Sequence, residues 1–331
     1  MRSGGMDKRT RIRYMRWRRK RIFKRVVTFG AVLSILLIGT NWIFGLLPDD
    51  EDEQGIINAT NLEVTRVNIA EEELEDSCGE IDFSPIVQVL ERYASDVAIY
   101  FENLESGCTF EHNAQEEFFA ASLKKAPFAL WIYQKAELGI VNLEERLVFT
   151  EEVFAGGSGV IRLNYEFGAT FSVEELLGLN LYESDNVATR MLHQRFSQDA
   201  YVRFVENIGG RRELIGDILG SLITANEAGL FAREIYEYIT SGSSYSQIFR
   251  QQLLNNQHQF IMADYPIASK TGWYRHYGGA WHDMAIIFAP SPFTLVILSS
   301  DKTGTAEDFN VFQAITDAFI QFNHINFGLS E

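Results

Sequence analysis

Cysteine and proline are scarce in this chain, whose 331 residues include two cysteines and six prolines. So few prolines exclude the collagen-like and proline-rich disordered classes. Two cysteines, Cys78 and Cys108, are too few for a disulfide-rich scaffold or a four-ligand zinc site. Hydrophobic residues make up 46% of the chain, which is enough for a sizeable folded core.

Positive charge is sparse outside the N-terminal end. Residues 1–25 hold 12 of the 29 lysines and arginines with a single acid, which leaves 17 bases and 44 acids in residues 26–331. Because residues 26–331 are strongly acidic, they repel the phosphates of nucleic acids. We therefore expect no nucleic-acid partner.

An uncharged run of 22 residues, 26–47, follows the basic end directly. As a helix it would span about 33 Å, enough for a hydrocarbon core of about 30 Å. The preceding bases predict that residues 1–25 form a cytoplasmic tail and that the rest of the chain is extracytoplasmic. A cleaved signal peptide is the alternative, but no small-x-small cleavage site is evident before Pro48. We predict a single-pass transmembrane helix that stays in the cell membrane.

Residues 48–80 are rich in acids and poor in bulky apolar residues, which predicts a solvated linker. Residues 81–331 have the size of one large domain or two interlocked lobes. We predict there a helix, two strands, a block of helices, two further strands and a closing helix, at residues 86–93, 97–103, 108–112, 120–255, 280–289, 293–299 and 305–322. Strands from both ends of the chain predict one antiparallel sheet, with the helices between them as a second lobe.

A serine and a lysine three positions apart, Ser122 and Lys125, form an S-x-x-K motif. If a helix starts near Ser122, the two side chains share a face and the Lys125 ammonium can reach the Ser122 hydroxyl. A serine nucleophile needs a neighbouring base, which a lysine removed from water can supply. By itself the motif is more typical of an ordinary helix start.

An S-D-N tripeptide, Ser184-Asp185-Asn186, follows the pattern VEELLGLNL, which Ser172 and Glu175 open as a capping box. The Ser184 hydroxyl can relay a proton, and the Asn186 amide can bind a substrate amide. We expect Asp185 to cap the next helix rather than to react. In isolation this tripeptide is also typical of a polar helix start.

A K-T-G tripeptide, Lys270-Thr271-Gly272, precedes a strand pattern. On a strand, the glycine lets a substrate backbone lie close to the edge, while the lysine and the threonine can hold a carboxylate. A turn that contains K-T-G also occurs commonly by chance.

In this order, with gaps of 58 and 83 residues, the three motifs resemble the signature set of class A β-lactamases and penicillin-binding proteins. Residues 81–331 are therefore similar to the serine β-lactamase and penicillin-recognising superfamily, and most similar to the class A β-lactamase domain. The resemblance implies an α+β fold, with a five-stranded antiparallel sheet flanked by N- and C-terminal helices and an all-helical lobe. The transmembrane helix would precede this domain. No cofactor is implied.

The resemblance also implies three catalytic residues. Ser122 would be acylated by the substrate carbonyl, and Lys125 would help to remove its proton. Ser184 would return a proton to the leaving nitrogen.

Five further residues would bind the substrate. Asn186 would hold the side-chain amide, and Lys270 and Thr271 would hold the carboxylate, next to Gly272. The backbone N–H of Trp273 would complete an oxyanion hole with the N–H of the nucleophile.

Two features depart from the class A pattern. The E-x-x-L-N motif, whose glutamate activates the deacylating water, is absent. Glu213 and Asp217 are the nearest acids, and an exposed loop charge is the simpler interpretation of both. Trp273-Tyr274-Arg275 is bulky where many family members have small residues. These departures predict slow deacylation rather than loss of acylation.

Histidines and glycines outside the motifs indicate no further site. The six histidines show no metal-ligating spacing, so we expect no metal. His276 and His282 flank a Gly-Gly turn, where a histidine is usually partly exposed. Residues 156–159, G-G-S-G, lack the lysine and the helix that a phosphate-binding loop needs.

Three functions fit these patterns. The first, which we expect, is a β-lactamase-related serine hydrolase that acts on a β-lactam or a peptidoglycan stem peptide through an acyl-enzyme. The second is a cell-wall D,D-peptidase or acyltransferase, which the anchor and the missing glutamate favour. The third is a non-enzymatic β-lactam or muropeptide sensor, but a tail of 25 residues is too small to be a folded output domain.

A disulfide between Cys78 and Cys108 is the last prediction. Both cysteines follow the transmembrane span and so lie on the non-cytoplasmic side. The helix near 82–94 and the strand 97–103 would be roughly 18–20 Å and about 23 Å long. If they run antiparallel, Cys108 returns beside Cys78 and closes a loop worth roughly 3–4 kcal/mol. The alternative is two unrelated thiols.

Overall fold

The computed structural model describes residues 78–92, 97–196, 198–211, 221–274, 279–300 and 307–328. The predicted tail and transmembrane helix, residues 1–47, lie outside these ranges, as does the acidic linker up to residue 77. Within the described ranges, no helix combines the length and the apolar character that a membrane crossing needs.

The helices and strands alternate along the chain much as the sequence predicts. The described elements are α2 (Ser84–Leu90), β1 (Val97–Asn103), β2 (Thr109–His112), β3 (Phe118–Phe119), α3 (Lys125–Glu137), β4 (Arg146–Val148), the 3₁₀-helix η1 (Glu151–Val153), α4 (Ile161–Asn164), β5 (Thr170–Ser172), α5 (Val173–Tyr182), α6 (Asn186–Arg195), α7 (Gln198–Asn207), β6 (Leu222–Ile223), α8 (Ala225–Thr240), α9 (Ser244–Leu254), β7 (Ile267–Tyr274), β8 (Ala280–Ile287), β9 (Phe293–Ser299) and α10 (Glu307–Phe327).

Five strands form the central antiparallel sheet, in the spatial order β2-β1-β9-β8-β7. The two ends of the chain meet in this sheet, because β1 pairs with β9 from Val97 opposite Ser299 to Asn103 opposite Phe293. β7 is an edge strand and pairs with β8 alone in this sheet. The predicted α+β fold with its five-stranded sheet is thereby confirmed.

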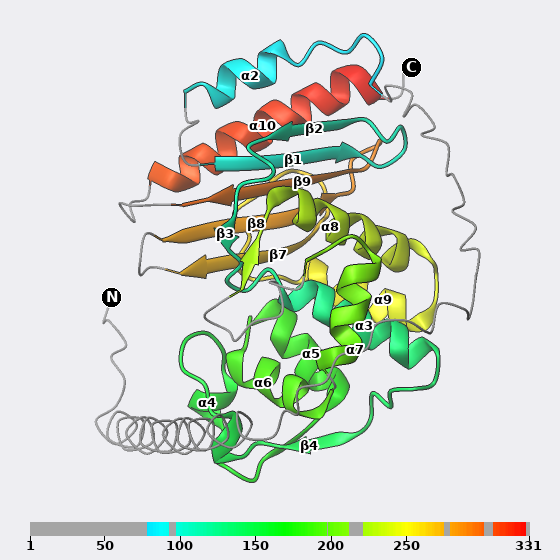
Figure 1. Ribbon diagram of the computed structural model, residues 1–331, viewed down its shortest axis with the longest axis vertical. Helices are drawn as coiled ribbons and strands as arrows, with labels where there is room; N and C mark the ends of the chain where they lie inside the picture. The colour runs from blue at the N-terminus through cyan, green and yellow to red at the C-terminus, as the bar shows by residue number, and fades with distance from the viewer. Residues whose placement is uncertain are drawn as a thin grey trace, which may run out of the picture. The chain divides into compact units, whose positions relative to one another are not determined.

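Helices cover both faces of the sheet (Figure 1). On one face α2 and α10 pack against each other, and on the other α8 lies against β1, β8 and β9. Side chains alternate between these faces. Ile99 and Phe101 therefore join the core beneath α10, whereas Ala98 and Tyr100 join the larger core that continues into the helical lobe.

Capping residues set where the helices of the second lobe begin. The Ser172 side chain and the Glu175 side chain each accept a hydrogen bond from the other residue's backbone N–H at the start of α5, which confirms the predicted capping box. Thr224 and Glu227 start α8 in the same way. Asp185 caps α6, as the sequence predicts.

The helix that carries the S-x-x-K motif begins later than predicted. α3 starts at Lys125, and Ser122 lies in the preceding turn, where the N–H groups of Lys125 and Ala126 donate to carbonyls three residues back. Ala121 has a φ of 46°, in the left-handed region, so a regular helix cannot begin there.

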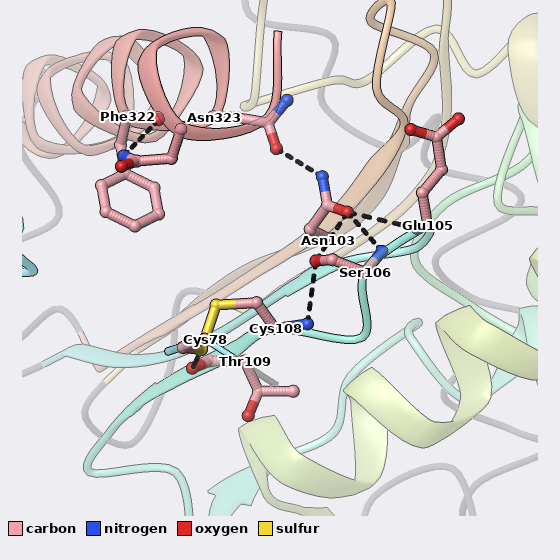
Figure 2. Close-up of a disulfide and its surroundings, with 9 residues drawn as sticks. Cys78, Asn103, Glu105, Ser106, Cys108, Thr109, Phe322 and Asn323 are labelled. Carbon is pink, nitrogen blue, oxygen red and sulfur yellow. Dashed lines mark hydrogen bonds between the residues drawn. A yellow bond between two sulfur atoms is a disulfide. The ribbon is translucent and has the colours of Figure 1, made fainter. Parts of the chain in front are cut away.

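The disulfide between Cys78 and Cys108 is present, which confirms the predicted pairing (Figure 2). The two Cα atoms lie 4.6 Å apart across a sequence separation of 30 residues. The hairpin from β1 to β2 returns Cys108 to the residues just before α2, as the lengths of helix and strand predict.

Asn103 fixes the same hairpin to α10 by its side chain (Figure 2). Its Oδ1 accepts from the backbone N–H groups of Glu105 and Ser106, at 3.2 and 2.9 Å. Its Nδ2 donates to Ser291 Oγ at 2.8 Å and to Asn323 Oδ1 at 2.9 Å. The disulfide edge of the sheet, far from β7, is thus held both covalently and by hydrogen bonds.

Candidate active site

The edge of the sheet meets the S-x-x-K turn at Gly272. A Cβ atom placed on Gly272 would lie 3.0 Å from the Ser122 backbone nitrogen and 3.1 Å from the Ala120 carbonyl oxygen. Only glycine allows so close an approach without moving the strand or the turn. The K-T-G strand and the serine turn, which are far apart in the sequence, are therefore in direct contact.

Two hydrogen bonds to Ser221 hold the residues on either side of Ser122 in place. The Ala120 N–H donates to the Ser221 carbonyl oxygen at 2.9 Å, and Lys124 Nζ donates to Ser221 Oγ at 2.6 Å. A left-handed non-glycine residue such as Ala121 costs about 1–3 kcal/mol, so neighbouring contacts must maintain it. Local strain is thus stored immediately before Ser122.

The ammonium group of Lys125 lies among oxygens of the S-D-N motif. Its Nζ donates to the Ser184 carbonyl oxygen at 2.6 Å, to Ser184 Oγ at 3.1 Å and to Asn186 Oδ1 at 2.8 Å. Among the described residues, the acceptors of Lys125 Nζ do not include Ser122 Oγ. The predicted hydrogen bond between Lys125 and Ser122 is therefore not formed in this structure. Catalytic hydrogen bonds often tighten only when substrate binds.

Two lysines converge on the Ser184 hydroxyl. Lys125 Nζ lies 3.1 Å and Lys270 Nζ lies 3.2 Å from Ser184 Oγ, and both lysines are buried. Lys270 Nζ also donates to the Thr271 carbonyl oxygen at 2.9 Å. Ser184 has a φ of 50°, a second strained position that turns its side chain toward the lysines. The hydroxyl thereby connects the helical lobe with the sheet.

Asp185 holds the S-D-N motif in place, as the prediction of a structural role requires. Its Oδ1 accepts from the N–H groups of Val187 and Ala188, at 2.8 and 3.0 Å. Its Oδ2 accepts from the Ile161 N–H at 2.8 Å. The carboxylate therefore joins α6 to α4 beneath Asn186.

The G-G-S-G segment belongs to the site, which the sequence did not indicate. The Asn186 side chain donates to the Gly156 carbonyl oxygen at 2.8 Å, and the Asn186 N–H donates to the Ser158 carbonyl oxygen at 3.1 Å. A Cβ atom on Gly157 would lie 2.6 Å from Asn186 Nδ2, and one on Gly159 would meet the Asp185 carboxylate at 2.3 Å. The glycines serve close packing against S-D-N, a signal that only the fold reveals.

Burial changes the proton affinity of both site lysines. Burial first, and then the positive charge of Lys270, holds the pKa of Lys125 well below its ordinary value, although the Asp185 charge opposes this. Burial lowers the pKa of Lys270 to about 7, against the opposing charge of Asp283. A lowered pKa makes the neutral amine of a lysine, which can accept a proton, easier to form.

Asp283 lies on β8 directly opposite Thr271. Its Oδ2 accepts from the backbone N–H groups of Phe260 and Ile261, at 2.8 and 3.0 Å. Burial raises the pKa of Asp283 to about 6, although these two N–H groups and Lys270 act to lower it. The carboxyl group is thus a buried charge partner beneath the K-T-G strand.

His282 is fully buried rather than partly exposed, because its side chain faces the lobe-side core from β8. Its Nδ1 accepts from the Ser299 N–H at 3.2 Å, so Nε2 carries the proton that it donates to the Phe119 carbonyl oxygen at 2.9 Å. Burial lowers the pKa of His282 to about 4. A neutral histidine therefore ties β8 to β3, which leads to Ser122.

The eight residues singled out from the sequence gather at the contact between β7 and the helical lobe. They are Ser122, Lys125, Ser184, Asn186, Lys270, Thr271, Gly272 and Trp273, and all are described. Glu213, Asp217 and Arg275 lie outside the described residues.

This arrangement suits acyl transfer. Half-buried Ser122 lies three residues before Lys125, whose pKa is lowered, and the Ser184 hydroxyl lies between Lys125 and Lys270. The close approach at Gly272 brings the backbone N–H of Ser122 next to the β7 strand. A backbone N–H beside a nucleophile can stabilise an oxyanion.

Comparisons with known proteins show the family and the fold. A model of the beta-lactamase enzyme family matches residues 84–322. No match was found among the curated proteins.

Among solved structures, the chain is similar to a beta-lactamase from Sphaerobacter thermophilus DSM 20745, with 20% identity, a TM-score of 0.65, and 74% of this chain and 99% of that one covered. It is also similar to a point mutant of PBP-A, solved as an acyl-enzyme complex with penicillin G, with 17% identity, a TM-score of 0.63 and coverage of 72% and 96%. A beta-lactamase from Chitinophaga pinensis DSM 2588 has 18% identity and a TM-score of 0.63, with 71% of this chain and 97% of that chain covered. At these identities the likeness is one of fold.

Proposed function

The chain is a member of the beta-lactamase enzyme family, and from this premise we propose that it forms an acyl-enzyme at Ser122 with a β-lactam or a D-alanyl peptide. The observation that carries the proposal is the convergence of Lys125 and Lys270 on the Ser184 hydroxyl, at 3.1 and 3.2 Å, beside the contact between Gly272 and the Ser122 turn. The acyl-enzyme complex of the PBP-A mutant with penicillin G supports the same chemistry on the same fold.

The proposed acylation balances as follows. Ser122 Oγ forms a bond to the carbonyl carbon while its proton passes to the neutral amine of Lys125. The C–N bond then breaks, and the Ser184 hydroxyl donates its proton to the leaving nitrogen while it regains one from Lys125, which lies 3.1 Å away. The N–H groups of Ser122 and Trp273 hold the oxyanion.

Substrate binding divides between the two sides of the nucleophile. The Asn186 amide, fixed by Gly156 and Lys125, holds the substrate's side-chain amide. The Lys270 ammonium and the Thr271 hydroxyl hold its carboxylate.

Deacylation is proposed to be slow, because the sequence lacks the E-x-x-L-N glutamate that would activate water. A cell-wall D,D-peptidase or acyltransferase is the second candidate. The same missing motif favours it, since a long-lived acyl-enzyme gives an acceptor amine time to replace water.

We also propose that residues 26–47 anchor the enzyme in the cell membrane with Ser122 on the extracytoplasmic side. The length of the uncharged run and the basic residues before it support this. The Cys78–Cys108 disulfide adds support, because such bonds persist mainly in oxidising compartments.

Intact-mass spectrometry of the protein incubated with penicillin G tests the proposal over time. A persistent adduct of one penicillin per chain is expected. A transient adduct would instead indicate an efficient β-lactamase, and no adduct at all would contradict the acyl-enzyme. Peptide mapping of the adduct checks that the label is on Ser122.

A further inference from the structure

A second lysine, Lys124, lies inside the S-x-x-K motif, and the proposed acylation steps do not use it. It is buried like Lys125, with only 7% of its surface exposed. Lysine is almost never buried unless it is paired. Lys124 and Lys125 occupy the N-cap and the first position of α3, where the helix dipole disfavours positive charge. Local helix stability therefore does not explain two lysines at this point.

The ammonium groups of the two lysines bind different segments. Lys125 Nζ lies among the oxygens of the S-D-N motif, whereas Lys124 Nζ donates to Ser221 Oγ at 2.6 Å. The Ser221 carbonyl oxygen also accepts from the Ala120 N–H, at 2.9 Å. Ala120 and Lys124 lie on either side of Ser122 in the chain. The Lys124 ammonium is thus held in a fixed place beside the serine turn.

The surroundings of Lys125 act on its charge in opposite senses. Its Nζ donates to three oxygens, at 2.6, 2.8 and 3.1 Å, and such acceptors favour the ammonium form, as does the charge of Asp185. Burial acts most strongly in the other sense, and the charges of Lys270 and Lys124 add to it. Because the proposed acylation needs the neutral amine of Lys125, both neighbouring lysines have a chemical use.

His193 of α6 experiences the same two charges. Burial first, and then the charges of Lys124 and Lys125, lower the pKa of His193 to about 4. His193 is therefore uncharged near neutral pH and adds no further positive charge to the site. Its shift shows that the charge of Lys124 reaches the interior of the helical lobe.

The other helices packed on α3 are α5, α7, α8 and α9. From α5, Asn180 contributes a neutral amide, whose Nδ2 donates to the Lys125 carbonyl oxygen at 3.3 Å. From α7, the Tyr201 hydroxyl is uncharged, because burial raises its pKa. Beside Lys270, α8 and α9 present apolar side chains, those of Ala232, Ile235 and Leu253. The charge of Lys124 thus acts on Lys125 across largely uncharged surroundings.

We propose that Lys124 is a positioning residue for acylation. Its ammonium group, fixed on Ser221, holds a further positive charge beside Lys125 and so keeps the amine of Lys125 free to accept the Ser122 proton. The inference rests on the proposed acyl-enzyme function and adds a residue that acts through Lys125 without touching the substrate.

The pH profile of acylation tests the inference. Rate constants for adduct formation with penicillin G are measured by mass spectrometry between about pH 4 and 9, for the wild type and for Lys124→Met. The rate should fall on the acid side as Lys125 becomes protonated. Loss of the Lys124 charge raises the pKa of Lys125, so this acid limb should move to higher pH by about 0.5–1 unit. The alkaline limb should stay in place, because burial and Asp283 set the pKa of Lys270.

Three further variants separate the charge from the contact. Lys124→Arg keeps the charge, so its acid limb should stay at the wild-type pH even if the rate falls. Ser221→Ala removes the hydrogen bond and keeps the charge, so it should slow acylation at every pH without moving the limb. Lys135→Met removes a charge from the same helix, roughly 16 Å further along, and should leave the profile unchanged.

An acid limb that does not move in Lys124→Met would overturn this inference alone. An equal movement in Ser221→Ala would overturn it too, since the effect would then come from a loosened turn. The same holds if neither the wild type nor Lys124→Met shows an acid limb, because Lys125 would then stay neutral without a further charge. Failure of the wild type to form any adduct at any pH would overturn the proposed function and the inference with it.

Discussion

On β7, the K-T-G motif is positioned by a regular antiparallel ladder, in which Lys270 lies opposite Met284 and Gly272 opposite His282. In the helical half of the site, the described residues that carry the motifs form no such ladder. Ser122 follows a left-handed residue and Ser184 is itself left-handed. Each serine proposed to react there lies at or beside a strained backbone position, and hydrogen bonds to Ser221 and from Lys125 maintain that geometry. The sheet half supplies a regular, rigid edge, and the helical half supplies the irregular geometry that the chemistry needs.

The largest effect should come from the helical half. Ser122→Ala should abolish covalent labelling by a fluorescent penicillin, because no nucleophile remains. Lys125→Ala should slow labelling by about 10²–10⁴-fold, since the proton acceptor is lost. Lys135→Ala, on the same helix but away from the S-D-N motif, is the control and should label normally. Undiminished labelling of Ser122→Ala would sink the mechanism.

The sheet half can be tested through its contact with the serine turn. Gly272→Ala places a Cβ 3.0 Å from the Ser122 nitrogen, which should shift strand and turn apart and slow acylation by about tenfold. Gly242→Ala, just after α8 and outside the site, is the control, because a Cβ there meets nothing within 4 Å. Stopped-flow labelling compares the two. Equal rates in both variants would show that the contact does not position the nucleophile.

A smaller effect is expected in the pH dependence of acylation. Lys270 must be protonated to bind a carboxylate, and its pKa of about 7 places the alkaline limb near pH 7. Asp283→Asn removes the negative charge that raises this pKa, so the limb should move to lower pH. Lys270→Arg keeps its charge and should remove the limb below about pH 9. Rate profiles between about pH 5 and 9 decide this, and a limb unmoved by Lys270→Arg would assign it to another group.

Deacylation should hardly depend on the nearest acids. Neither Glu213→Gln nor Asp217→Asn should change the decay of the penicillin adduct by more than a few fold, since the glutamate motif is absent. Adduct decay followed by mass spectrometry measures this. If the wild type hydrolysed the adduct quickly and either substitution abolished that hydrolysis, the substituted acid would be the group that activates water in place of the missing glutamate.

The smallest effect on chemistry should follow reduction of the disulfide. The bridge adjoins β2, at the opposite edge of the sheet from β7, so acylation should change by less than about twofold. The free energy of unfolding should nevertheless fall by roughly 3–4 kcal/mol. Urea unfolding and penicillin labelling of the oxidised and the reduced protein separate the two quantities. A matching loss of acylation would mean that the two edges are coupled.

Local signals explain how much of this structure the sequence could predict. The Ser172 capping box, the Asp185 cap and the β1–β2 hairpin depend on neighbouring residues, and each was predictable. The role of Gly157 was not, because it arises from packing against a residue of another segment. The same holds for buried His282, whose partners come from β3 and β9.

The site itself shows the same division. The motif order predicted which side chains gather, since it carries a family resemblance. It could not predict that Lys125 bonds Ser184 and Asn186 rather than Ser122, because that depends on where α3 begins. The left-handed conformation of Ala121 has no sequence signature of its own.

The disulfide also determines how mechanical tension enters the domain. A pull on the chain before Cys78 is transmitted through the sulfur–sulfur bond to Cys108, and so bypasses α2, which would otherwise be peeled from α10 first. The load then spreads over the β1–β2 ladder and the Asn103 hydrogen bonds to α10. β7 is the last strand of the sheet to feel it. A pull at this end therefore enters the sheet at the edge opposite to β7, the strand that contacts the Ser122 turn.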